Sequence, residues 1–158
     1  DNVLTGHYRY MHNVCVGARM VIASSYPVVM TDTVSETAAF YRDLFGFETT
    51  FDAGWYVSLK NDEGERPFEL ALLQFDHETV PEGFRSRAQG VLINLEVDDA
   101  TAAYERIQPL PGIRIAKELR DEEFGQRHFI LVDPSGTLVD VIENIPPSEA
   151  FMANYQNG

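Results

Sequence analysis

Apolar and polar residues alternate along this chain in a pattern that predicts one helix and four strands in its first half. A short β-branched strand is expected over residues 26–31. Apolar residues then recur at helical spacing, in a helix that we expect to be capped by Ser35 and to end at Gly46. Three more strands, separated by turn-forming residues, are expected over 47–52, 55–60 and 68–75.

The same order of elements is predicted in the second half. A strand is expected over 91–97, and Asp98 or Asp99 is expected to cap a helix that extends to about Gln108. The last two strands are separated by Asp133-Pro134-Ser135-Gly136, in which proline and glycine stand where a type I turn prefers them. The three strands of this half are expected over 113–119, 127–132 and 138–142.

Two short sequence matches indicate an internal repeat. Thr37-Ala38-Ala39-Phe40-Tyr41 in the first predicted helix resembles Thr101-Ala102-Ala103-Tyr104 in the second. Gly46-Phe47 and Gly112-Ile113 follow the two helices in the same way. Each half alone is too small to bury a good core. We therefore expect an α+β fold in which two tandem βαβββ modules form a curved mixed sheet around a cleft, by pairing their sheets edge to edge.

These elements divide the chain into segments. The two modules are expected over residues 24–76 and 90–145, as one structural domain, joined by a polar linker over 77–89. Residues 1–23 show no sustained period and are expected to form an N-terminal extension. Residues 146–158 are expected to form a C-terminal tail that either packs across a subunit interface or frays.

Composition and charge exclude several kinds of function. The 158 residues carry 12 Lys and Arg against 25 Asp and Glu, and the net charge of −13 argues against nucleic acid or an anionic membrane surface as a partner. The single cysteine, Cys15, excludes an internal disulfide and a multi-cysteine zinc site. No apolar run reaches the ~18 residues of a transmembrane helix. Because no secretory pattern precedes Arg19, a cytoplasmic location is expected.

Four stretches of the sequence form a distinctive combination of motifs. They are Ala39-Phe40-Tyr41-Arg42-Asp43-Leu44-Phe45-Gly46-Phe47, Leu95-Glu96-Val97-Asp98-Asp99 with Ala102-Ala103, Phe124-Gly125-Gln126-Arg127, and Val132-Asp133-Pro134-Ser135-Gly136. Together they resemble the vicinal oxygen chelate superfamily, which includes glyoxalase I, fosfomycin-resistance enzymes, extradiol dioxygenases and bleomycin-resistance proteins. The resemblance extends over about residues 24–143. These stretches are scaffold features, so they indicate the fold and not the chemistry.

The resemblance implies that catalytic relatives hold a divalent metal in the cleft, with ligands from the first and last strands of each module. Aligned on the stretches above, those positions fall on Tyr26, Glu69, Leu92 and Asp140. Leu92 has no donor atom, and tyrosine is a poor ligand for most of these metals. The two carboxylates alone would hold a hard ion only weakly. We therefore expect no resident metal cofactor, with a divalent metal as the alternative.

An organic ligand is the other expected occupant of the cleft. Asp52-Ala53-Gly54-Trp55-Tyr56 resembles a bleomycin-resistance strand that carries a tryptophan after a glycine, and a Trp face stacks on flat heterocycles and on cations. Trp55 could equally be a core residue. Asn94 stands in an apolar strand, and a buried amide needs either a ligand or an internal partner. Strand alternation predicts as ligand-binding residues Trp55, Gln74 or Phe75, Asn94, Phe124, Gln126 and His128.

Other polar residues carry weaker signals. The acidic run Asp121-Glu122-Glu123 is expected to be a solvated loop, with a cleft rim that attracts a cation as the alternative. A surface or structural role is expected for His77. His128 would share one strand face with Gln126, so it is the histidine most relevant to a site.

Three functions remain open from the sequence. The first is a homodimeric, glyoxalase- and bleomycin-resistance-like protein that sequesters a small organic ligand, cationic or aromatic, without a metal; we choose it on the lost metal positions, Trp55 and the negative charge. The second is a lyase, isomerase or dioxygenase with an altered metal site built on Asp140 and Glu69, with His128 or Tyr26. The third is a ligand-free dimeric regulatory domain.

Overall fold

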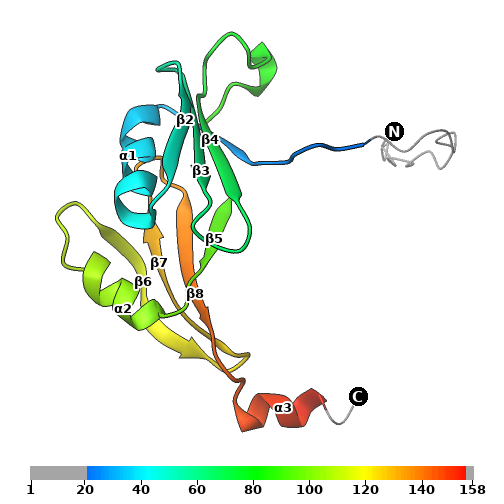
Figure 1. Ribbon diagram of the computed structural model, residues 1–158, viewed down its shortest axis with the longest axis vertical. Coiled ribbons are helices and arrows are strands. Elements are labelled where there is room, and N and C mark those ends of the chain that lie inside the picture. The colour runs from blue at the N-terminus through cyan, green and yellow to red at the C-terminus, as the bar shows by residue number, and fades with distance from the viewer. Residues whose placement is uncertain (1–20, 156–158) are drawn as a thin grey trace, which may run out of the picture.

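The computed structural model describes residues 21–155 (Figure 1). Cys15 and nearly all of the predicted N-terminal extension lie outside the described residues. The first module contains β1 (Val28–Thr31), α1 (Val34–Phe45), β2 (Glu48–Asp52), β3 (Tyr56–Asn61) and β4 (Phe68–Gln74). The second contains β5 (Leu92–Glu96), α2 (Ala100–Ile107), β6 (Arg114–Glu122), β7 (Gln126–Val132) and β8 (Leu138–Asn144). The βαβββ order therefore occurs twice, as predicted.

Local signals explain where the two module helices begin and end. α1 begins after Thr33, whose carbonyl accepts the first helical hydrogen bond, so the predicted cap at Ser35 is wrong. It ends at Gly46, whose φ of 68° is the left-handed conformation that glycine tolerates best. α2 begins after Asp99, whose Oδ1 accepts a hydrogen bond from the Ala102 N–H at 2.8 Å. Both the Gly46 stop and the Asp99 cap are confirmed.

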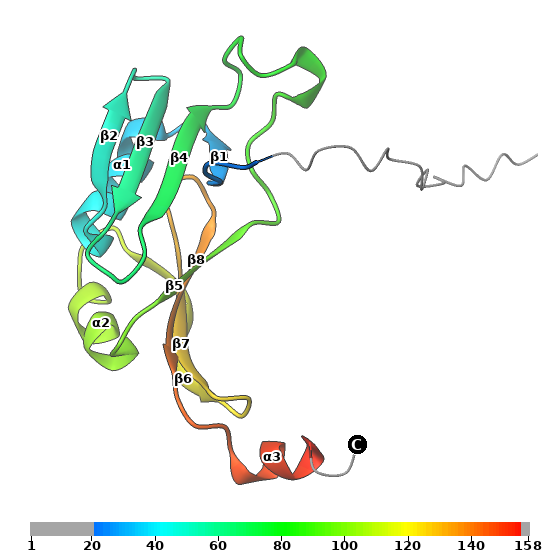
Figure 2. The same ribbon diagram turned by 45° about the vertical axis from the view of Figure 1, so that its right-hand side comes forward.

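Each module forms its own four-stranded sheet (Figure 2). The strand orders are β1-β4-β3-β2 and β5-β8-β7-β6, with one parallel and two antiparallel pairs in each. The predicted α+β class and the tandem βαβββ modules are confirmed. Within the described residues the sheets do not pair edge to edge. The Ala88 N–H donates to the Met30 carbonyl at 2.8 Å, so the linker lies against the free edge of β1 in place of β5.

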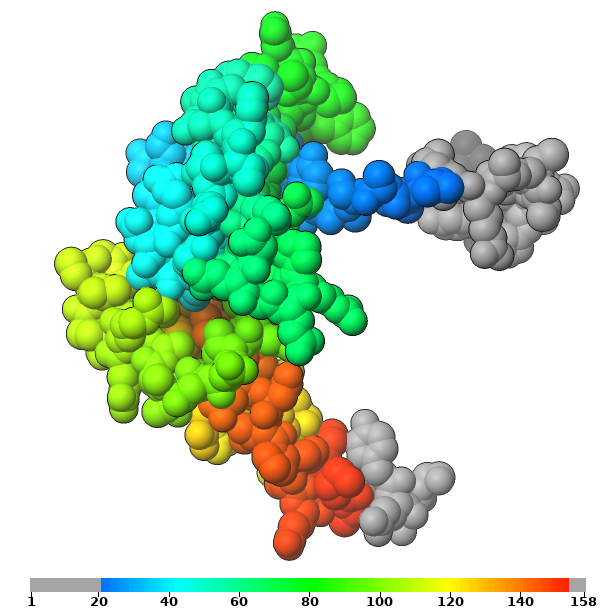
Figure 3. Space-filling view, in the orientation of Figure 1, coloured from blue at the N-terminus to red at the C-terminus, as the bar shows by residue number. Residues whose placement is uncertain are grey.

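Two short helical segments lie where we expected a linker and a tail. One is a 3-10 turn in the linker, η1 (Glu82–Phe84), and the other is α3 (Glu149–Tyr155), which is capped by the Ser148 hydroxyl. The chain before α3 is attached to the β6–β7 turn, because Ile145 N–H donates to the Gly125 carbonyl at 2.9 Å. α3 projects beyond the body of the second module (Figure 3). Among residues 21–155, no helix is long and apolar enough to cross a membrane.

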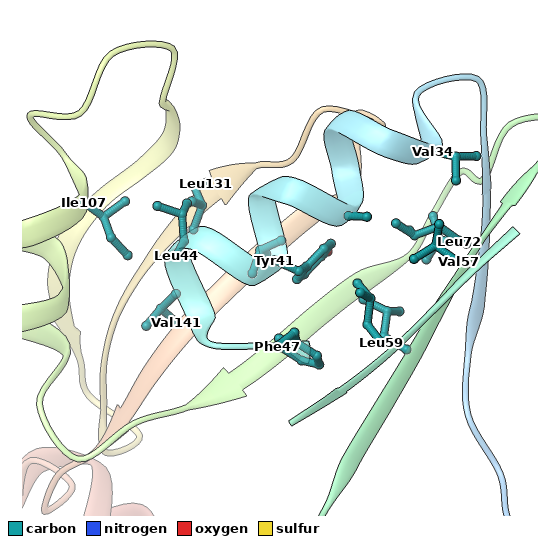
Figure 4. Close-up of a cluster of buried hydrophobic side chains, with 14 of the residues drawn as sticks. Val34, Tyr41, Leu44, Phe47, Val57, Leu59, Leu72, Ile107, Leu131 and Val141 are labelled. Carbon is teal, nitrogen blue, oxygen red and sulfur yellow. The ribbon is translucent and has the colours of Figure 1, made fainter. Parts of the chain in front are cut away.

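One hydrophobic core joins the two modules on the helix side of both sheets (Figure 4). Tyr41 is fully buried in it, and burial raises the pKa of its hydroxyl, which keeps its proton and donates to Asp133 Oδ2 at 2.9 Å. Arg106 on α2 donates to the Leu44 carbonyl at the end of α1 at 2.8 Å. Other members of the core include Leu59, Leu72, Ile107, Phe129, Leu131 and Val141. The modules are therefore held together through their helices.

The sheet faces opposite the helices carry apolar side chains that the described residues 21–155 leave exposed. Side chains alternate along each strand, so every second residue points away from the core. Val28 and Phe51 on the first sheet, and Leu92 and Leu138 on the second, are exposed large apolar residues of this kind. We call these surfaces the open faces of the first and second sheets.

Candidate functional site

The open face of the second sheet carries several of the polar residues that the sequence placed in a cleft. The strand register puts Asn94 of β5 opposite Asp140 of β8, and Asp140 opposite Ile130 of β7. His128 and Gln126 follow on the same face of β7, because residues two apart in a strand share a face. Four predicted residues from three strands thus lie on one surface.

His128 is held between two carboxylates on this face. Its side chain is almost fully buried; Nδ1 lies 2.8 Å from Asp140 Oδ1, and Nε2 lies 3.1 Å from Glu122 Oε1. Carboxylates only accept hydrogen bonds, so both contacts are hydrogen bonds when the ring carries both of its protons. Lys117 Nζ and Arg120 Nε contact the same Glu122 oxygen at 3.1 and 3.0 Å. We call Asp140, His128 and Glu122 with these two cations the His128 chain.

The prediction that the acidic run Asp121-Glu122-Glu123 is a solvated loop is wrong for its first two residues. β6 extends to Glu122, which pairs with Gln126, so Asp121 and Glu122 belong to a strand and not to a solvated loop. The hydrogen bonds from His128 and Lys117 lower the pKa of Glu122, and other nearby positive charge adds to the effect. The unexpected length of β6 is what brings a second carboxylate to His128.

The lowered pKa of Glu122 predicts a contribution to acid stability. A carboxylate with a depressed pKa stabilises the folded state above its unfolded value of 4.5, and this contribution is lost as the pH falls through the lower folded pKa. We therefore expect Glu122→Gln to be less stable than the wild type near pH 7, and to lose less stability on acidification below about pH 5. Urea unfolding followed by circular dichroism at several pH values measures both quantities.

The matched control for this prediction is Glu123→Gln. Glu123 is an exposed neighbour at the β6–β7 turn, and its variant should keep the pH dependence of the wild type. An acid profile of Glu122→Gln that runs parallel to that of the wild type would show that Glu122 makes no such contribution.

The residues at the implied metal positions do not form a ligand set. Tyr26 precedes β1 and Glu69 lies on β4, both in the first module, while Leu92 has no donor atom. Asp140 is engaged by His128. Within residues 21–155, no group of three or more His, Cys, Asp or Glu side chains is arranged to hold a metal ion. A resident metal of the kind that the resemblance implies does not fit these donors.

The open face of the first sheet is aromatic. The Phe51 and Tyr56 ring centroids are 6.2 Å apart, and partial burial, with the neighbouring Tyr26 hydroxyl, raises the pKa of Tyr56. Leu73 extends this surface, since it pairs with Tyr56 on one side and with Met30 on the other. Sequence reasoning missed Phe51 and Tyr56 as site residues. Their common face depends on a bulge in β2, which no local signal marks.

Trp55 lies at the turn between β2 and β3, stacked on another ring. Its plane is within 3° of that of His77, with 3.7 Å between the ring centroids. Trp55 is 37% exposed, so it is not a core residue. Gln74 lies beside it, since the Gln74 N–H donates to the Trp55 carbonyl at 2.8 Å and its side chain donates to Asp76. The predicted residues Trp55 and Gln74, with His77, thus form one group at the end of the first sheet.

The predicted ligand-binding residues therefore fall into two groups. Asn94, Gln126 and His128 lie on the second sheet, with the exposed Phe124 at the β6–β7 turn, whereas Trp55 and Gln74 lie in the first module. The β2–β3 turn and the β6–β7 turn are at opposite ends of the molecule (Figure 2). Asn94 is exposed, so the expectation of a buried amide is wrong.

Solved structures share this fold at low sequence identity. A protein of unknown function from Agrobacterium tumefaciens str. C58 is 25% identical, with a TM-score of 0.58 over 82% of this chain and 96% of that one. A lactoylglutathione lyase from Agrobacterium tumefaciens is 22% identical, with a TM-score of 0.59 over 77% of this chain and 94% of that one. At this identity the lyase shows a likeness of fold alone.

A family enzyme from Burkholderia phytofirmans PsJN, described as a glyoxalase/bleomycin resistance protein/dioxygenase, is 20% identical, with a TM-score of 0.64 over 77% of this chain and 98% of that one. No curated protein matches the sequence significantly. The model of the Glyoxalase/Bleomycin resistance protein/Dioxygenase superfamily matches residues 23–141, which is most of the chain. The chain belongs to this superfamily.

Proposed function

We propose that this chain binds a small organic ligand with a flat aromatic or cationic part on its open faces, without a resident metal and without catalysis. The proposal rests on the contact between Asp140 and His128. Asp140 is the one carboxylate of the second module at an implied metal position, and His128 already occupies it. Both His128 nitrogens are also committed to carboxylates. The nitrogen and oxygen atoms that would coordinate a metal are thus paired with one another.

The chemistry of the open faces supports an organic ligand. On the first sheet, Phe51 and Tyr56 offer aromatic rings to a flat molecule, and the exposed Tyr26 ahead of β1 lies next to Tyr56. On the second sheet, the His128 chain is bordered by the exposed apolar Leu92 and Leu138, which pair with each other. Apolar walls with a few fixed polar groups are typical of small-molecule sites. The net charge of −13 favours a cationic ligand.

A second copy of the chain completes the site in this proposal. Within one chain the aromatic face and the His128 chain belong to different modules, and Figure 1 shows the two sheets displaced from each other along the molecule. Superfamily members commonly form dimers and bind small ligands. Placing the first sheet of one copy against the second sheet of its partner would bring the aromatic rings to the His128 chain.

One observation favours a second function, a metal-dependent lyase, isomerase or dioxygenase with an altered site. Glu122, His128 and Asp140 form a contiguous set of one imidazole and two carboxylates, which are ligand types for divalent cations. To bind an ion, His128 would have to release at least one of its carboxylate partners. Metal content separates the two functions, because only the second requires an ion bound to this set.

Phe51→Ala is expected to weaken ligand binding while leaving the fold intact. The probes are metal-free bleomycin and a panel of cationic aromatic antibiotics, followed by Trp55 fluorescence and by calorimetry. The Phe51 ring is exposed and offers its face to a ligand, so its loss should raise the Kd by about 5-fold. Phe84→Ala, which removes an exposed ring on η1, is the matched control and should bind as the wild type does.

Two results would count against the proposed function. The absence of saturable binding by every probe would leave the open faces without a ligand of this class. An equal loss of affinity in Phe51→Ala and Phe84→Ala would indicate contact with exposed rings in general and not a site.

A further inference from the structure

A pocket of about 340 Å³ lies at the junction of the two modules. It shares Asn94 with the open face of the second sheet, but no residue of the His128 chain, nor Phe51 or Tyr56, lines it. Its first wall consists of three phenylalanine rings, Phe45 and Phe47 at the end of α1 and Phe68 at the start of β4. Its second wall is formed by residues 94–97, which are the last three residues of β5 and Val97 directly after it. The volume is within the range of small-molecule sites, and the lining is largely apolar.

The wall formed by β5 is the free edge of the second sheet. The Val97 N–H donates to the Ile142 carbonyl of β8, and successive residues of a strand direct their backbone groups to opposite edges. The backbone N–H and carbonyl groups of Asn94 and Glu96 therefore point to the edge that β8 does not occupy. Among the described residues, neither the Asn94 nor the Glu96 side chain has a hydrogen-bond or ion-pair partner.

The charge around this pocket is negative. An adjoining groove of about 570 Å³ shares Phe68, Glu96 and Val97 with it and adds three more carboxylates and one cation, Arg66. One of those carboxylates, Glu143, already accepts a hydrogen bond from the Ala100 N–H at 3.0 Å. Glu96 is the carboxylate that lines the junction pocket as well as the groove, and it is unpaired within residues 21–155, so it is the one that a ligand in the pocket would meet.

We infer that this junction pocket is a second binding site, for a small organic cation with an apolar arylalkyl body. The body lies between the rings of Phe45, Phe47 and Phe68, which offer apolar contact and aromatic faces. The ammonium group donates to the Glu96 carboxylate and to the free backbone carbonyls of the β5 edge. An anion of the same shape meets the same rings but is repelled by Glu96 and its acidic neighbours.

Because the pocket is built from both modules, an occupant contacts both and stabilises their association. A ligand that binds only the folded protein raises its apparent stability by mass action. Binding at the junction therefore has a readout that does not need Trp55, the shift in unfolding temperature with ligand concentration. Phe68→Ala and Phe51→Ala then assign that shift to the junction pocket or to the open face of the first sheet.

The test compares 4-phenylbutylammonium with its anionic counterpart 4-phenylbutyrate, by calorimetry and thermal unfolding. We expect the ammonium compound to bind and the carboxylate not to bind. Glu96→Gln and Phe68→Ala should each raise the Kd of the ammonium compound by about 5-fold. Both side chains are exposed, so neither substitution removes a residue of the hydrophobic core. Glu105→Gln and Phe84→Ala are the matched controls, on α2 and η1, and should leave the Kd unchanged.

Other outcomes would overturn the inference. Equal binding of the two compounds would remove the role of the carboxylate, and an unchanged Kd in Glu96→Gln and Phe68→Ala would place the compound elsewhere. A loss of affinity in Phe51→Ala in place of Phe68→Ala would assign the compound to the open face, which would support the proposed function while refuting the junction site. If no antibiotic binds the open faces while the ammonium compound still binds through Glu96 and Phe68, the proposed function is refuted and the junction site is supported.

Discussion

Asp133→Ala is expected to lower the free energy of unfolding by about 3 kcal/mol or more. Asp133 is buried in the turn between β7 and β8, where it accepts hydrogen bonds from the Tyr41 hydroxyl, from Ser135 and from the Thr137 N–H. The alanine leaves several donors without a partner, among them a fully buried hydroxyl from the other module. Each buried group left unpaired costs about 1–3 kcal/mol, so the expected loss is well above that of an ordinary substitution.

Urea unfolding of Asp133→Ala, Tyr41→Phe and the double variant tests this expectation. Tyr41→Phe removes only the hydroxyl and is expected to cost about 1–2 kcal/mol. Since the two groups are direct partners, the double variant should lose less stability than the sum of the single variants. Asp121→Ala is the control, because the Asp121 ion pair with Arg127 is on the surface and its loss should change stability little. Additive losses would show that the Tyr41–Asp133 contact does not couple the modules.

Gly125→Ala is expected to lower the free energy of unfolding by about 3 kcal/mol. Gly125 has a φ of 101°, which is strained for any residue with a Cβ. A Cβ there would also lie 2.7 Å from the Ile145 carbonyl oxygen and 3.1 Å from Pro147. This close approach is where the chain after β8 is attached to the β6–β7 turn, so the substitution must displace the segment that leads into α3.

Gly112→Ala is the matched control for this close approach. Gly112 also has a positive φ, 81°, but no atom lies within 4 Å of a Cβ built there. Its variant should lose only the free energy that a positive φ costs a residue with a Cβ, about 1 kcal/mol. Chemical denaturation measures both losses, and hydrogen exchange at Ile145 reports on the attachment. Equal losses in the two variants would show that the contact with Ile145 has no energetic weight.

The elements of this fold were predictable because their signals are local. The Gly46 stop and the Asp99 cap depend on residues within one turn of the helix end, and the repeat of βαβββ follows from periodicity. The α3 helix was missed, because seven residues after a proline pair carry little periodic signal. The separation of the sheets was also missed, since nothing near Ala88 indicates that its N–H bonds to Met30.

The candidate site was less predictable, because its contacts join distant residues. Asp140 and His128 were each singled out from the sequence, but their hydrogen bond depends on the β7–β8 register. Glu122 was assigned to a solvated loop because adjacent acidic residues are usually exposed. Pairing of β6 with β7 overrides that tendency and places the carboxylate on the Nε2 side of the ring. The exposure of Asn94 likewise depends on β5 being an edge strand.

Metal content, measured together with ligand binding on one preparation, decides whether this protein binds its ligand without a metal. The protein is purified without chelator or a metal-binding tag and analysed by elemental mass spectrometry. It is then titrated with a cationic aromatic antibiotic that does not chelate metals. We expect no stoichiometric divalent metal, and the same Kd before and after dialysis against a chelator. About one divalent ion per chain, lost together with binding in Asp140→Asn, would contradict it.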